Sequence, residues 1–277
     1  MADGDDPRPI AMFDSGFGGL TVARAVIDLL PDEDLVYLGD TGRYPYGSRP
    51  AAEVREFALE IGRLLVAEHH AKALIVACNT AAAAALDDLR AAVAVPVIGV
   101  IDPGVRSLLA ATGTKRVGVI ATVGTVRSGA YQRLVAEIDP GVDLTCAACP
   151  GFVEFVERGD TDSDQVRVLA ERLLAPLVDA EVDSLLLGCT HYPFLARTIG
   201  GVMGRDVVLV SSADETAFEV RAVLDGVHEA VGGRVARRAG DRPGRHRFLS
   251  SGDIEWFRRQ GARLLGPEVA EVEPVRW

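Results

Sequence analysis

Two kinds of apolar pattern alternate along the chain. Runs of four or five uncharged apolar residues predict strands buried on both faces, and apolar residues spaced three and four apart predict amphipathic helices. We expect strands at residues 9–13, 35–38, 74–77, 97–101, 117–121, 142–146, 185–187, 207–210 and 248–250. We expect helices at residues 20–30, 54–65, 81–90, 126–138, 166–177, 198–203, 211–227 and 254–265. This alternation predicts an α/β fold of largely parallel sheets flanked by helices, with functional groups at the carboxyl ends of the strands.

The two halves of the chain have similar internal spacing. Asp14, at the end of the first predicted strand, precedes Cys78 by 64 residues, and Thr122 precedes Cys189 by 67 residues. We interpret this as a diverged internal duplication, which produces two similar, pseudo-symmetric domains that face each other. An active site is then expected in the cleft between them.

The end of the chain divides one domain into two pieces. The second repeat is complete near residue 210, and the tail still holds a helix, a short strand and a terminal helix. We expect a crossover back to the first sheet, so the first domain is discontinuous, at residues 8–101 and 211–277. Residues 102–210 then form the second domain, and residues 1–7 form a disordered tail.

Composition narrows the possible functions. The 277 residues are 48% hydrophobic, enough for a sizeable core, and the net charge of -11 with a pI near 5.0 argues against a nucleic-acid binder. No apolar run reaches about 18 residues, so we expect no membrane span, and the acidic amino terminus is unlike a signal peptide. We therefore expect a cytoplasmic protein whose four cysteines are thiols rather than disulfides.

Two cysteines stand at the ends of matching strands. The run 74–77 leads into Cys78, and the run 185–188 leads into Cys189. The thiolate is the reactive form of cysteine, and the exposed N–H groups of a helix amino terminus favour it. Two thiols on opposing domains could remove a proton from one face of a carbon and return one to the other, which inverts a stereocentre. The alternative is that both are buried structural cysteines.

The loop that begins at Asp14 has further interpretations. Its glycines, Gly16, Gly18 and Gly19, match a phosphate-binding loop only weakly, and no lysine follows them. Asp14 would repel a phosphate, but it would suit a substrate ammonium or would set the protonation state of a nearby thiol. The structural alternative is a turn residue that caps a helix.

Other reactive side chains have simpler interpretations. Cys146 and Cys149 have a Cys-x-x-Cys spacing, but neither a thioredoxin-like pattern nor a second such pair accompanies them, so we expect structural roles. His191 alone among the histidines follows a strand end and a cysteine. The others are expected on solvated helix faces or loops: His69, His70, His228 and His246. The arginines between Arg234 and Arg247 predict a mobile, solvated loop.

Five motifs, in one order, resemble those of bacterial glutamate racemases in the aspartate/glutamate racemase superfamily. They are Phe13-Asp14-Ser15-Gly16, Gly39-Asp40-Thr41, Pro45-Tyr46-Gly47, Ala77-Cys78-Asn79-Thr80 and Gly188-Cys189-Thr190-His191. The resemblance runs from about residue 9 to residue 265. It implies a cofactor-independent isomerase that interconverts L- and D-glutamate and supplies D-glutamate for peptidoglycan, and hence for cell-wall biogenesis and cell shape.

The resemblance also implies a role for each site residue. Cys78 and Cys189 would be the paired acid and base, acting on the D- and L-isomer respectively, with Asp14 assisting the first thiol and His191 the second. Substrate contacts would come from Asp14, Ser15, Tyr46, Gly47, Asn79, Thr80, Thr122, Thr125, Thr190 and His191. No metal, pyridoxal phosphate or nucleotide is implied, and a homodimer is an assembly that the resemblance allows.

Two departures and two rival functions accompany this resemblance. Phe17 stands where a small aliphatic residue is usual, and the arginine-rich segment is longer than usual. The nearest rival is an aspartate or hydantoin racemase of the same superfamily; His191 favours glutamate, since the aspartate enzymes usually carry an acidic residue there. A rival of another class is a non-catalytic protein that binds a small ligand in the same cleft.

Overall fold

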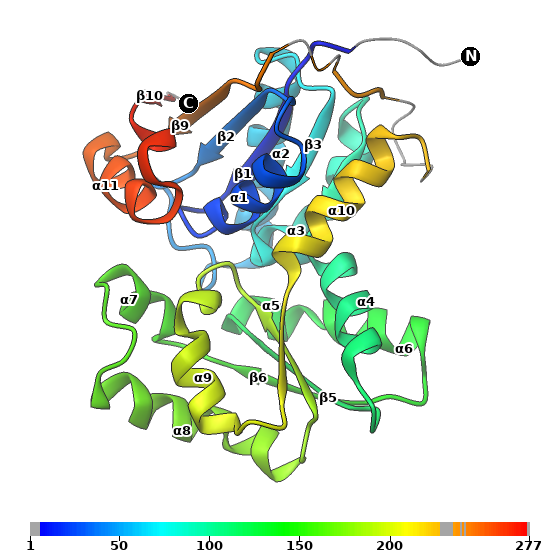
Figure 1. Ribbon diagram of the computed structural model, residues 1–277, viewed down its shortest axis with the longest axis vertical. Helices are drawn as coiled ribbons and strands as arrows, with labels where there is room; N and C mark the ends of the chain where they lie inside the picture. The colour runs from blue at the N-terminus through cyan, green and yellow to red at the C-terminus, as the bar shows by residue number, and fades with distance from the viewer. Residues whose placement is uncertain (1–5, 228–234, 239, 241, 276–277) are drawn as a thin grey trace. The chain divides into compact units, whose positions relative to one another are not determined.

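The computed structural model describes residues 6–227, 235–238, 240 and 242–275. The chain divides into two compact units, Met1–Val100 with Ala213–Trp277, and Ile101–Ser212. The boundaries expected at residues 101 and 210 lie within two residues of these. Each unit contains a parallel sheet of its own (Figure 1).

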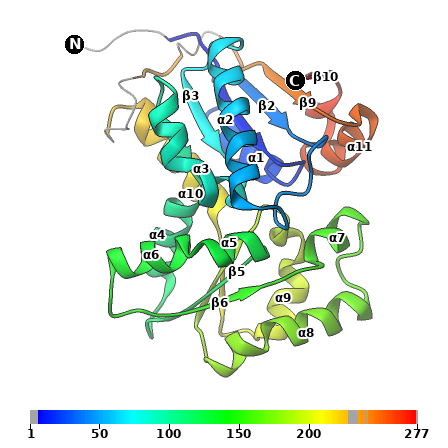
Figure 2. The same ribbon diagram turned by 180° about the vertical axis from the view of Figure 1, so that it is seen from behind.

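The first unit is built on a six-stranded sheet in the order β10-β9-β2-β1-β3-β4, in which every pairing is parallel. Its strands are β1 (Ile10–Asp14), β2 (Leu35–Gly39), β3 (Ala73–Val76), β4 (Val97–Gly99), β9 (His246–Ser250) and β10 (Val272–Pro274). Its helices are α1 (Leu20–Leu29), α2 (Ala51–Ala67), α3 (Asn79–Ala92), α10 (Ser212–Leu224), α11 (Ile254–Leu265) and the 3-10 helix η2 (Gly266–Val269). Helix α1 packs with α11 on one face of the sheet and α2 packs with α3 on the other (Figures 1 and 2), so β1 and β3 are wholly buried.

The second unit is built on a four-stranded parallel sheet in the order β6-β5-β7-β8. Its strands are β5 (Arg116–Ala121), β6 (Asp143–Ala148), β7 (Ser184–Gly188) and β8 (Val208–Ser211). Its helices are α4 (Ile101–Ala111), α5 (Val123–Ser128), α6 (Ala130–Ile138), α7 (Phe152–Glu157), α8 (Asp164–Asp179), α9 (Ala196–Met203) and the 3-10 helix η1 (Tyr192–Leu195). Helix α4 packs with α6, and α8 packs with α9.

Both sheets share one strand order. The order β2-β1-β3-β4 in the first unit corresponds to β6-β5-β7-β8 in the second, strand for strand along the chain. The predicted α/β class, with two similar units of parallel sheet and flanking helices, is therefore confirmed. Strands β9 and β10 belong to the first sheet alone, where β9 returns to pair with β2.

Some element boundaries differ from the prediction for identifiable reasons. The single helix predicted at 126–138 is two helices, α5 and α6, because Gly129 takes a positive φ of 71° between them. Helix α4 is missing from the prediction because its Pro103-Gly104 pair is typical of a turn, yet proline is tolerated in the first turn of a helix. Helix α3 begins at Asn79 rather than at residue 81, so Asn79 and Thr80 lie in its first turn.

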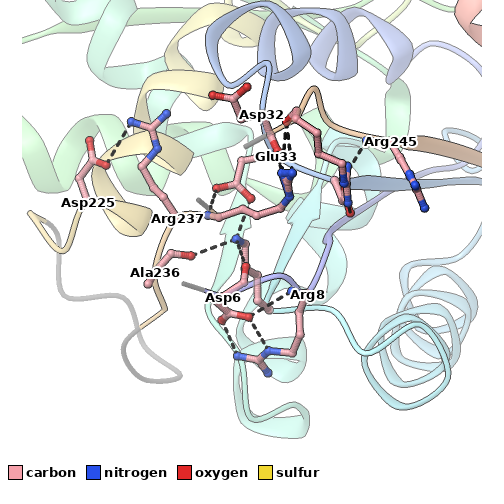
Figure 3. Close-up of polar contacts among 12 residues, drawn as sticks. Asp6, Arg8, Asp32, Glu33, Asp225, Ala236, Arg237 and Arg245 are labelled. Atoms are coloured by element: carbon pink, nitrogen blue, oxygen red, sulfur yellow. Dashed lines mark hydrogen bonds and ion pairs between the residues drawn. The ribbon is translucent and has the colours of Figure 1, made fainter. Parts of the chain in front are cut away.

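The arginine-rich segment is not solvated in its described residues, which corrects the prediction of a mobile loop. Arg238 is buried, and its main-chain N–H donates to Glu33 Oε1 at 2.8 Å. Arg242 pairs with Asp34 at 2.6 Å between Nη2 and Oδ2. The acidic run 32–34 supplies these partners, so opposite charge holds the segment against the turn between α1 and β2 (Figure 3).

A buried lysine fastens the start of the chain to this segment. Lys72 Nζ lies 2.6 Å from Glu33 Oε2 and donates to the main-chain oxygens of Asp6 and Ala236 at 2.9 and 3.0 Å (Figure 3). Disorder is predicted for residues 1–7, but Asp6 is held by this ammonium group. Residues 1–5, like the predicted positions of His228 and Arg234, lie outside the described residues.

Two expectations from composition can be compared with the structure. In the described part of the chain, no helix combines the length and the apolar character needed to cross a bilayer. All four cysteines lie among the described residues and none of them forms a disulfide, as predicted. His246, expected on a solvated surface, instead begins strand β9 and is half-buried.

Candidate active site

Neighbouring strands bring two predicted residues together in the first unit. Phe13 on β1 pairs with Val76 on β3 in parallel register. Asp14 ends β1, and Cys78 follows β3 two residues after Val76. Both side chains therefore lie at the carboxyl edge of this sheet, where parallel α/β sheets place their functional groups.

The loop after β1 surrounds these two side chains with polar atoms. Asp14 is fully buried, and its Oδ1 accepts the N–H of Gly16 at 2.8 Å. The Cys78 Sγ lies 3.7 Å from Ser15 Oγ, within hydrogen-bonding range for sulfur. Gly19, not Asp14, is the N-cap of α1, so the interpretation of Asp14 as a helix cap is wrong. Gly19 also permits close packing, because a Cβ there would lie 2.6 Å from the Asp14 Cβ.

Cys78 occupies the N-cap position of α3, yet the thiolate expected there is not favoured. Burial, and then the charge of Asp14, raise the pKa of Cys78 to about 11. Hydrogen bonds from the Ala81 main chain and from Ser15 lower the pKa and only partly offset these effects. Cys78 is therefore a thiol at neutral pH, since desolvation outweighs the helix terminus. Its thiolate, once formed, is a correspondingly strong base.

The loop after β2 carries Tyr46 and Gly47. Tyr46 is buried, its hydroxyl donates to Asp40 Oδ2, and its ring centroid lies 5.7 Å from that of Phe57. Burial, with the charge of Asp40 adding to it, raises the pKa of Tyr46. The hydroxyl is thus occupied within the protein, which leaves the main chain of Tyr46 and Gly47 as the part available to a ligand.

Thr122 holds the position in the second unit that Asp14 holds in the first, directly at the end of the equivalent strand. Its Oγ1 caps α5 by accepting the N–H of Thr125 at 3.3 Å, and it lies 3.0 Å from Thr125 Oγ1. The second unit therefore presents two hydroxyl groups where the first unit presents a carboxylate.

Cys189 follows β7 as Cys78 follows β3, but its surroundings differ. The Cys189 Sγ lies 4.0 Å from His191 Nδ1, and His191 Nε2 lies 3.9 Å from Glu157 Oε1. Burial lowers the pKa of His191 to about 4, so its imidazole is neutral at pH 7. An N–H at Nε2, on the side of Glu157, leaves Nδ1 as an acceptor facing the thiol. The next helical element is the short 3-10 helix η1 rather than an α-helix, so the helix terminus predicted beside this thiol is missing.

Each unit gathers part of the predicted set of residues at the carboxyl edge of its sheet. The first unit holds Asp14, Ser15, Tyr46, Gly47, Cys78, Asn79 and Thr80, and the second holds Thr122, Thr125, Cys189, Thr190 and His191. Glu157 was not predicted, because it ends α7, a helix without a clear period in the sequence. Asp40 is a second addition; its one signal is the polar Gly39-Asp40-Thr41 after a strand.

The Cys-x-x-Cys pair lies apart from Cys189 in its chemistry. Burial raises the pKa of Cys146 to about 11 and that of Cys149 to about 12, and Cys149 Sγ lies 3.9 Å from the Ala147 oxygen. Buried, protonated thiols fit the structural role expected of them. Among the described residues, no group of three or more His, Cys, Asp or Glu side chains is placed to hold a metal ion.

Known proteins share both this sequence and this fold. The family model for Asp/Glu/hydantoin racemases matches residues 20–231. The chain belongs to that family, a class of isomerases. Its similarity is to the glutamate racemases within it. The enzyme of Acidothermus cellulolyticus is 51% identical over 264 residues, which cover 95% of this chain and 97% of the relative.

Solved structures give the same comparison. A glutamate racemase isoform from Bacillus anthracis has a TM-score of 0.89 at 40% identity, covering 97% of both chains. The glutamate racemase of Francisella tularensis, solved in complex with D-glutamate, has a TM-score of 0.86 at 32% identity, covering 98% of both chains.

Proposed function

We propose that this protein interconverts L- and D-glutamate by a two-base mechanism in which Cys78 and Cys189 act on opposite faces of the α-carbon. The observation that carries the proposal is the repetition of one arrangement, a thiol that follows the third strand of each unit, β3 and β7. Nearly full-length similarity to glutamate racemases supports glutamate as the substrate. The product D-glutamate would serve peptidoglycan synthesis in the cytoplasm.

Each thiol needs a protonation state opposite to that of its partner. In the D-to-L direction the Cys78 thiolate removes the α-proton, and the Cys189 thiol delivers a proton to the other face; the L-to-D direction reverses these roles. Both directions use the form of the enzyme that has lost one thiol proton, so the pH dependence belongs to the pair of thiols. Neutral His191 is suited to accept and return the Cys189 proton through Nδ1.

The remaining residues would bind and stabilise the substrate. The buried Asp14 carboxylate suits the substrate ammonium and, by raising the pKa of Cys78, strengthens that base. Ser15, Asn79, Thr80 and the Tyr46-Gly47 main chain would contribute contacts from the first unit, and Thr122, Thr125, Thr190 and His191 from the second. The α-proton of an amino acid is far less acidic than a thiol, so oriented donors in a dry site must stabilise the carbanion.

Hydrogen exchange in D₂O tests the mechanism with single variants. Cys78→Ser should still let Cys189 exchange the α-hydrogen of L-glutamate with solvent, but should form almost no D-glutamate. Cys189→Ser should show the converse, with exchange into D-glutamate alone. Mass spectrometry of each enantiomer after chiral separation reads out both results. Near-normal racemisation by either variant would contradict the two-base mechanism.

The substrate and the enzymatic nature of the protein are tested by the same purified chain. Optical rotation should decay with glutamate and stay constant with aspartate; the reverse result would assign it to the aspartate enzymes of the family. Deuterium that stays out of the α-position of bound glutamate would instead indicate a protein that binds glutamate without acting on it.

A further inference from the structure

Asp40 is a buried carboxylate for which the proposed proton transfer has no use. It follows β2 and is fully buried. Three side chains donate to it: the Tyr46 hydroxyl and Arg43 Nε (2.7 Å) to Oδ2, and the Ser251 hydroxyl (2.5 Å) to Oδ1. Such charge-assisted hydrogen bonds are about twice as strong as neutral ones.

The donors come from two segments that are far apart in the sequence. Arg43 and Tyr46 belong to the loop after β2, whereas Ser251 follows β9 in the segment that returns to the first unit. Two neighbouring contacts join the same segments: Thr41 Oγ1 lies 2.7 Å from Ser250 Oγ, and the Gly42 N–H donates to Ser251 Oγ at 3.0 Å. The return segment therefore fastens the start of this loop.

The loop is braced from two other sides. The Arg43 guanidinium lies 4.3 Å from the centroid of the Phe57 ring on α2 and pairs with Glu60 of the same helix. The Tyr44 ring packs on the loop that carries Asp14, where a Cβ added at Gly16 would lie 3.2 Å from it. Asp40 thus stands at the centre of the contacts that place Tyr46 and Gly47 beside the Asp14 loop.

We infer that Asp40 is a positioning residue: it holds the main chain of Tyr46 and Gly47 in the geometry that receives the amino-acid substrate, and Ser251 makes the return segment part of this support. The inference rests on the proposed function. A loop ordered before binding pays less conformational entropy when the ligand arrives. Loss of this order therefore falls mainly on KM, while the thiols that move the proton stay in place.

Steady-state kinetics of Asp40→Asn with L- and D-glutamate test the inference. KM should rise about tenfold for both enantiomers, and kcat should fall less than about threefold. Because the enantiomers have equal free energy, kcat/KM must remain the same in both directions, which checks the data internally. The matched control is Asp183→Asn in the second unit, where Asp183 likewise fastens a loop by accepting from Thr112 and Thr114. This control should lower thermal stability and leave KM unchanged.

A double-mutant cycle separates positioning from a general loss of stability. Tyr46→Phe alone should raise KM, but in the Asp40→Asn background it should add nothing, since its acceptor is already altered. If Asp40→Asn does not fold, Ser251→Ala and Tyr46→Phe, singly and together, carry the same test through smaller rises in KM. An unchanged KM in folded Asp40→Asn, or an equal rise in Asp183→Asn, would overturn the inference. Wild-type protein that does not racemise glutamate would instead refute the proposed function before any variant is compared.

Discussion

Alkylation of Cys78 as a function of pH tests the electrostatic account of the first half-site. The rise of the Cys78 pKa from the ordinary 9.0 to about 11 disfavours the thiolate by about 3 kcal/mol, because one pH unit corresponds to about 1.36 kcal/mol. At pH 7 about one molecule in ten thousand then carries the thiolate, and at pH 9 about one in a hundred. Since iodoacetamide reacts with the thiolate, the rate should increase about tenfold per pH unit across this range.

Mass spectrometry of the Cys78 peptide measures this rate in the substrate-free protein and in Asp14→Asn. Removing the Asp14 charge takes away the second cause of the raised pKa, so the rate profile of the variant should shift to lower pH. Cys149, in the same digest, is the control, because burial alone raises its pKa to about 12 and its profile should not move. A Cys78 rate that levels off near pH 9 would refute the dominance of burial, and superimposed profiles would refute the role given to Asp14.

Three further predictions concern stability, each measured by denaturant unfolding. The folded pKa of His191 lies below its ordinary 6.5, so its contribution is complete above pH 6.5 and stability falls by up to about 3 kcal/mol as the pH drops to about 4; His191→Asn should lose this dependence, and the exposed-site control His70→Asn should keep it. Glu33→Ala leaves the Lys72 ammonium buried without its carboxylate and should cost about 3–5 kcal/mol, a value that an unchanged midpoint would exclude. Thr122→Ala removes the cap of α5 and should cost about 1 kcal/mol; no change would show that water replaces the hydroxyl.

Local chemistry explains why much of the site could be predicted. Each predicted thiol follows a run of aliphatic residues that folds as a fully buried strand, and parallel strands of this class end at one edge of their sheet. The spacing between Asp14 and Cys78 recurs between Thr122 and Cys189 because both units repeat one strand order. Period and strand order are properties of short segments, so the sequence reveals them directly.

The arginine-rich segment shows where such reasoning fails. Its glycines, proline and charges are typical of a solvated loop, and its partners lie about 200 residues earlier in the chain. Only the return of β9 to the edge of β2 brings Arg238 and Arg242 to the acidic run 32–34. Glu157 was missed for the same reason, since it approaches His191 from another element.

The sequence by itself determined the α/β class, the duplication and the two thiols at strand ends, because these follow from apolar periodicity and from residues adjacent in the chain. Tertiary structure alone decided the protonation of Cys78 and His191, since both pKa values depend on how much water the surrounding elements exclude. It also decided the role of Asp40, whose donor Ser251 is 211 residues away. Desolvation and long-range hydrogen bonds are properties of the packed chain, and no local pattern encodes them.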